Sequence, residues 1–133
     1  MSRSFVGVVV ALLAWFVAAT LGNLVLRVAL PGYTQVEVAM TFTLAMLIAR
    51  LVLGLVSSLA AGFVCAAIAP AGSPAAKVTA GLLVALFLPV HYGLWARFPI
   101  WYHLFFLGSL APMVLLGAAL QPILVGRQAT ATP

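Results

Sequence analysis

The sequence predicts an all-α integral membrane protein, a four-helix bundle with a long second helix and both termini on the same side. Hydrophobic residues fill 66% of the 133 positions, charged residues only 5%, and the mean hydropathy is +1.30. Soluble domains carry about 25% charged residues, so this chain has too few charges to cover a surface that faces water. Four long apolar runs, separated by short polar or Pro- and Gly-containing breaks, supply the membrane spans.

A single transmembrane domain covers residues 1–133 in this interpretation, with helices over 5–27, 36–69, 77–96 and 101–125. The first run is expected to be retained rather than cleaved, because it is longer than the about 7–15 apolar residues of a signal sequence. Pro-containing segments then separate the runs: Pro31-Gly32, Pro70 to Pro74, and Arg97-Phe-Pro99.

Five of the six basic residues lie singly beside or beyond the apolar runs, which is typical of interfacial anchors. Six dispersed charges form no continuous patch, so we expect no nucleic-acid partner. Four spans place Arg3, Lys77 and Arg127 on the side of the termini, against Arg27 and Arg97 on the other side. This excess favours cytoplasmic N- and C-termini.

Small residues mark the helix faces that pack in lipid, because they let backbones approach closely. In the second helix they recur at every fourth position, as Gly54, Ser58, Gly62 and Ala66. A similar ridge in the third helix, Gly81, Ala85, Pro89 and Gly93, is also expected to pack inward. The same motif serves contacts within one chain and contacts between copies, so a homo-oligomer remains an alternative.

Arg50 interrupts the second apolar run and is the first candidate for a functional residue, because charges inside spanning segments are costly and often functional. It starts the ridge that Gly54 continues, so it points toward the packed face. One interpretation is a buried polar pocket around Arg50, with Asn23 contributing to it. The other is an anchor that snorkels to the headgroups, with residues 34–49 as an interfacial extension. A straight helix keeps Glu37 about 20 Å from Arg50, so the two could pair only through a bend or a second chain. Glu37 is instead expected to be solvated near the start of the second helix, where a negative charge suits the helix dipole.

His91 and His103 complete the candidate polar pocket. His91 falls opposite the small-residue ridge of its helix, so it is expected to face headgroups or a partner. A haem or a metal held by the two rings would require equal depth in the membrane, and the two positions do not obviously match. The sequence predicts no catalytic residues, no metal site and no cofactor, since carboxylate pairs and phosphate-binding motifs are missing from it.

Three segments carry a resemblance to a known group of proteins: Ala61 to Pro70, Phe98 to His103, and Pro112 to Gly117. They resemble the end of helix two, the third loop and the fourth helix of small four-helix bacterial inner-membrane proteins of unknown function. The resemblance implies four helices and a location in the bacterial inner membrane. It implies no activity and no functional residues.

Three functions are compatible with these features. The first is an accessory or scaffold subunit of a membrane complex, with the lipid bilayer and other membrane subunits as partners, because packing surface is abundant and reactive groups are few. The second is a small transporter or channel with an outer-leaflet polar pocket around Arg50. The third, a haem-containing or lipid-active enzyme using His91 and His103, has the least support in the sequence.

Overall fold

The computed structural model describes residues 2–131, and side chains as far as Arg127. Its helices are α1 (Arg3–Ala29), α2 (Tyr33–Glu37), α3 (Leu44–Ile68), α4 (Ala75–Gly93) and α5 (Ile100–Ala131). The described residues are therefore all-α, as predicted. By length and composition, α1, α3, α4 and α5 are each able to cross a membrane, which makes this a multi-pass membrane protein.

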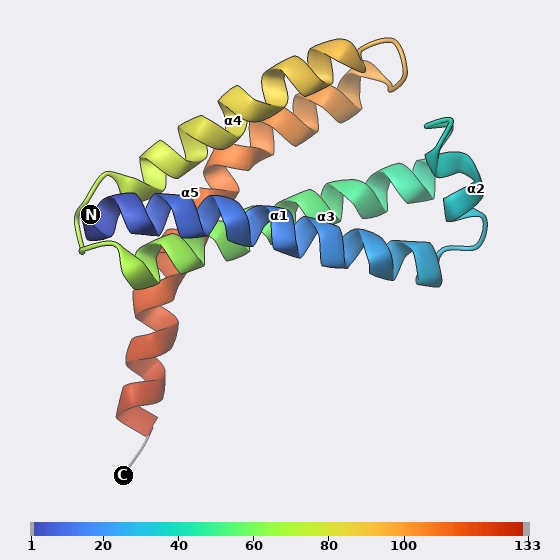
Figure 1. Cartoon of the computed structure of the whole chain (residues 1–133). Coiled ribbons are helices and arrows are strands. Elements are labelled where there is room, and N and C mark those ends of the chain that lie inside the picture. The colour runs from blue at the N-terminus through green and yellow to red at the C-terminus, as the bar shows by residue number, and fades with distance from the viewer. Residues whose placement is uncertain (1, 132–133) are drawn as a thin grey trace.

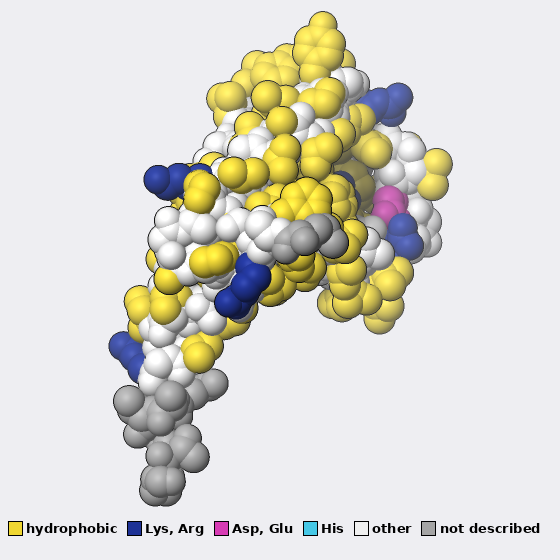
Figure 2. Space-filling model, turned by 60° about the vertical axis from the view of Figure 1, so that its left-hand side comes forward, with side chains coloured by type: hydrophobic (Ala, Val, Ile, Leu, Met, Phe, Trp, Pro, Cys, Tyr) yellow, Lys and Arg dark blue, Asp and Glu magenta, His cyan; other side chains and the backbone are white. Residues whose placement is uncertain are grey.

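The four long helices form two pairs that diverge toward one end of the molecule. In Figure 1, α1 lies beside α3, and α4 lies beside the first half of α5, while the second half of α5 projects away from the bundle. The start of α1 and the α3–α4 loop share the closed end, and the loops after α1 and α4 lie at the open end. Hydrophobic side chains cover most of the face in Figure 2, with basic side chains dispersed over it.

The predicted long second helix is divided in two. Residues 38–43 are not helical, and α3 begins only at Leu44. Thr43 causes the new start, since its side chain accepts a hydrogen bond from the backbone N–H of Met46 at 3.3 Å, which satisfies one of the free donors of the first turn. Met40 takes a positive φ of 55° in the turn before it. The prediction of one helix over 36–69 is therefore wrong, and the break folds α2 back toward α1.

The tightest contact of the fold joins α3 to α5, and we call it the crossing: Leu59, Gly62, Val114, Gly117 and Ala118. A Cβ built on Gly62 would lie 1.8 Å from the backbone oxygen of Val114, and one on Gly117 would lie 2.1 Å from that of Leu59. Because only glycine permits this approach, the two backbones meet without intervening side chains. The ridge predicted on the second helix is thus inside the fold, with Ser58 buried and Gly54 against the Phe106 ring.

The small-residue ridge of α4 has the opposite orientation to the one predicted. Gly81, Ala85, Pro89 and Gly93 are all exposed, and a Cβ on Gly81 or Gly93 would meet no atom within 4 Å. α4 instead turns Thr79, Leu83 and His91 inward. Small residues permit close approach but do not require it, so their spacing alone does not tell which face of α4 packs inward.

Candidate binding cleft

A cleft of about 470 Å³ opens where the two helix pairs diverge. This volume is within the about 300–1,000 Å³ range of small-molecule pockets. Its lining comes from all four long helices and from the segment that links α2 to α3. Exposed side chains of α1 and α4, namely Phe16, Leu24 and Val90, form part of that lining. Both helices are membrane-spanning candidates, and these exposed side chains mark a mouth of the cleft.

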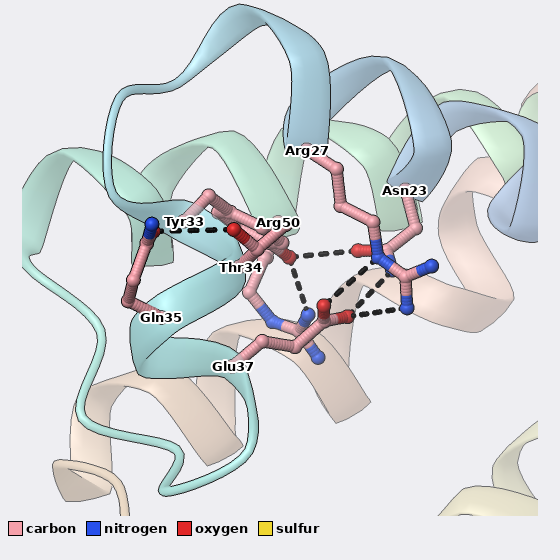
Figure 3. Close-up of polar contacts among 7 residues, drawn as sticks. All are labelled: Asn23, Arg27, Tyr33, Thr34, Gln35, Glu37 and Arg50. Carbon is pink, nitrogen blue, oxygen red and sulfur yellow. Dashed lines mark hydrogen bonds and ion pairs between the residues drawn. The ribbon is translucent and has the colours of Figure 1, made fainter.

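A polar network closes the end of the cleft nearest α2 (Figure 3). The Arg27 guanidinium donates to both oxygens of Glu37, from Nε at 2.8 Å and from the terminal nitrogen at 3.0 Å. The Asn23 amide donates to the same carboxylate at 2.9 Å, and the Tyr33 hydroxyl donates to the Asn23 oxygen at 2.7 Å. Glu37 is therefore paired at the end of α2 rather than solvated at the start of a long helix, because the break in the second helix brings it back to α1.

The network leaves Glu37 ionised. The hydrogen bonds from Arg27 and then Asn23 hold the pKa of its carboxyl below the usual value, since both favour the charged form. Its negative charge is thus already balanced by Arg27.

Arg50 contributes a positive charge that is not balanced in this way. One terminal nitrogen donates to the Tyr33 hydroxyl at 2.7 Å, and the guanidinium lies over the Phe42 ring, 4.6 Å from its centroid. Its Nε is buried and has no hydrogen-bond partner in the part of the chain that the structure describes. Glu37, the only acidic side chain of the chain, forms its ion pair with Arg27. Among the described residues, Arg50 therefore brings a cation without a paired anion into the cleft, as the buried-pocket interpretation expects.

Aromatic rings form the other wall of the cleft. Trp15 of α1 packs against Phe87 of α4 with ring centroids 4.7 Å apart, and Phe87 meets Phe106 of α5 at 5.2 Å. The indole N–H of Trp15 donates to the buried Ser58 hydroxyl at 3.0 Å, which fixes the ring. The cleft is thus polar at one end and aromatic along its length.

His91 and His103 meet, contrary to the expected mismatch in depth. Their Nδ1 atoms are 2.8 Å apart, and both residues are buried. The expectation that His91 faces headgroups or a partner is also wrong, since it lines the cleft. The two positions are equally distant in sequence from Arg97, in the loop between α4 and α5. A hairpin that turns there places them side by side, and this symmetry is the signal that could have found the pair.

The structure brings four of the five predicted pocket residues to one cavity: Asn23, Glu37, Arg50 and His91. His103 lies behind His91 and does not line the cleft. Tyr33 and the aromatic wall were missed, because apolar residues are so frequent in this sequence that composition cannot separate a cavity wall from a lipid-facing surface. Within residues 2–131, three or more metal-ligating side chains do not come together.

Comparisons of the chain with protein-family models, curated proteins and solved structures find no match. The function is therefore argued from the cleft itself.

Proposed function

We propose that this chain binds an amphipathic anion from the surrounding membrane in the cleft and acts as a small carrier or transporter for it. The observation that carries the proposal is Arg50, a cation that forms no ion pair with any described residue and lies at the polar end of an otherwise aromatic cavity. An arginine in an apolar setting is costly unless a partner offsets its charge. A carboxylate, sulfonate or phosphate group matches the planar donor set of its guanidinium.

The shape of the cleft supports a ligand with an apolar tail. Trp15, Phe87 and Phe106 offer ring faces and edges beyond the polar end, and burial of apolar surface there is favourable. The exposed residues Phe16 and Val90 near the mouth belong to spanning helices. A ligand that already resides in the bilayer therefore reaches the cleft without crossing water.

The proposed location is the bacterial inner membrane, with cytoplasmic termini. The basic residues Arg3, Lys77 and Arg127 on the side of the termini support this orientation. It directs the Arg50 end of the cleft toward the outer leaflet.

Binding of decanesulfonate, a permanently charged amphipathic anion, tests the proposal. Native mass spectrometry from mild detergent is expected to show one bound anion on the wild type. Arg50→Gln should weaken binding at least about tenfold, because hydrogen bonds to charged groups contribute about 1.5–3 kcal/mol.

Arg97→Gln is the matched control, since it removes one positive charge from an exposed position outside the cleft. It should bind like the wild type. Equal affinities of Arg50→Gln and Arg97→Gln would overturn the proposal, as would equal binding of uncharged decanol.

The second candidate function is an accessory or scaffold subunit, and the exposed ridge of α4 favours it. Gly81, Ala85 and Gly93 offer a surface on which another helix could approach closely. Purification in mild detergent checks this candidate: a stable second protein or second copy supports it, and a consistently solitary monomer counts against it.

A further inference from the structure

We propose that the cleft binds its anion together with one proton, the anion at the Arg50 guanidinium and the proton at Nε2 of His91. This inference rests on the proposed function, because the anion site is the one described above. It adds a proton site that faces the cleft, and it assigns the ligand the chemistry of an amphipathic weak acid.

The hydrogen bonds around His103 determine where the proton can go. Its Nε2 lies 3.3 Å from the carbonyl oxygen of Trp95. A carbonyl only accepts hydrogen bonds, so Nε2 of His103 carries the hydrogen and donates it. In the neutral ring, Nδ1 of His103 is then an acceptor.

His91 is oriented by that acceptor. Its Nδ1 lies 2.8 Å from Nδ1 of His103, so it must carry the hydrogen of this bond. The lone pair of His91 is consequently on Nε2, to which no described residue donates. His91 lines the cleft, and Nε2 is not among the fully buried atoms without a partner. Nε2 is therefore the atom of the pair that a ligand or a proton can reach.

The pair accepts one proton and not two. Protonation at Nε2 of His91 preserves both existing hydrogen bonds, because the three ring nitrogens that form them, both Nδ1 atoms and Nε2 of His103, keep their present roles. Protonation at Nδ1 of His103 would set two N–H groups against each other at 2.8 Å. The hydrogen-bond chain thus directs a single proton to the cleft side.

The charges around His91 couple this proton to the anion. Arg50 of α3 and Tyr102 of α5 line the same cleft, and His103 of α5 lies behind the ring. Arg27 of α1 is paired with Glu37 at the end of α2. In the empty cleft, protonated His91 would add a second cation near Arg50. An anion at Arg50 offsets the guanidinium charge, so the proton binds more favourably when the anion is present. By linkage, the anion must bind more tightly when the proton is present.

Calorimetric titration of decanesulfonate into the protein in lipid nanodiscs, with empty nanodiscs as the blank, measures this coupling. Decanesulfonate does not titrate between about pH 5 and pH 8, the range in which histidine changes charge. Heats compared in Bis-Tris and Tris, two amine buffers whose ionisation enthalpies differ and which bring no competing oxyanion, count the protons taken up. We expect uptake of up to one proton per anion, and affinity that falls by up to about tenfold for each unit rise in pH.

His91→Gln tests whether the proton binds to His91, since a glutamine amide can still donate to His103 but does not titrate. It should bind the anion with no buffer-dependent heat and no pH dependence of affinity. Tyr92→Phe is the control, because Tyr92 adjoins His91 in sequence but is exposed and lies outside the cleft. It should take up protons like the wild type.

Each result is decisive. Wild-type binding without proton uptake overturns this inference and leaves the proposed function standing, and uptake that persists in His91→Gln overturns the assignment to His91. No wild-type binding overturns both. If His91→Gln does not fold, ¹⁵N chemical shifts of histidine-labelled wild type decide instead: a shift at Nε2 of His91 on adding the anion supports the proposal, and unchanged shifts overturn it.

Discussion

The crossing and the cleft are built on the same helix in two different ways. At the crossing, Gly62 of α3 and Gly117 of α5 bring two backbones into direct contact. Two to three turns earlier on α3, Arg50 and Gly54 face a cavity instead. The first region holds the two helix pairs together, and the second is where they separate. The comparison shows that a bundle in lipid can be fixed at one end and still hold a ligand site at the other.

Gly62→Ala should have the largest effect on the stability of the fold, because it disrupts the contact that holds the two helix pairs together. The new Cβ would meet the backbone of Val114 at 1.8 Å, and a backbone cannot rotate aside as a side chain can. We expect destabilisation at or above the about 1–3 kcal/mol usual for overpacking. Thermal unfolding in mild detergent measures it.

Gly81→Ala is the matched control, since its Cβ would have no neighbour within 4 Å. It should leave the unfolding temperature unchanged or raise it slightly, because alanine favours the helix over glycine. Equal losses in the two variants would show that the crossing does not depend on close approach at Gly62.

Glu37→Gln should have the smallest effect on stability, because it changes only the hydrogen bonds at the polar end of the cleft. The hydrogen bonds from Arg27 and Asn23 lower the pKa of Glu37 in the folded protein. A lowered folded pKa gives a stabilisation that is present above the unfolded-state value and is lost as the pH falls toward the folded value.

Unfolding temperatures measured as the pH is lowered below about 5 test this direction of the pH dependence of stability. The wild type should lose stability over that interval, and Glu37→Gln should lose less. A variant with the wild-type pH profile would exclude a contribution of the Arg27–Glu37 pair to stability.

The difference between the two regions also explains what the sequence could predict. The four spans follow from apolar run length, and the ridge from Gly54 to Ala66 follows from its four-residue spacing. The ridge of α4 was placed on the wrong face, because spacing identifies small residues but does not say which helix approaches them. The break before Leu44 was missed, because the Thr43 cap competes with an apolar pattern that continues through it.

The polar site was predicted in part for a related reason. Arg50, Asn23 and Glu37 stand out because charged and amide groups are rare in an apolar chain. Their network could not be predicted, since it depends on α2 folding back to Arg27. The pairing of His91 with His103 depends on where the α4–α5 hairpin turns, and that is a property of the loop rather than of either helix.

Photolabelling in a bilayer tests the central claim most directly. A fatty acid with a diazirine in its acyl chain is incorporated into vesicles with the wild-type protein, and labelled residues are identified by mass spectrometry. The account predicts labelling of the buried or half-buried cleft residues Trp15, Phe87 and Phe106, reduced by excess decanesulfonate and by Arg50→Gln. Labelling that is confined to exposed side chains outside the cleft, such as Leu13 and Leu86, and that decanesulfonate does not reduce, would contradict it.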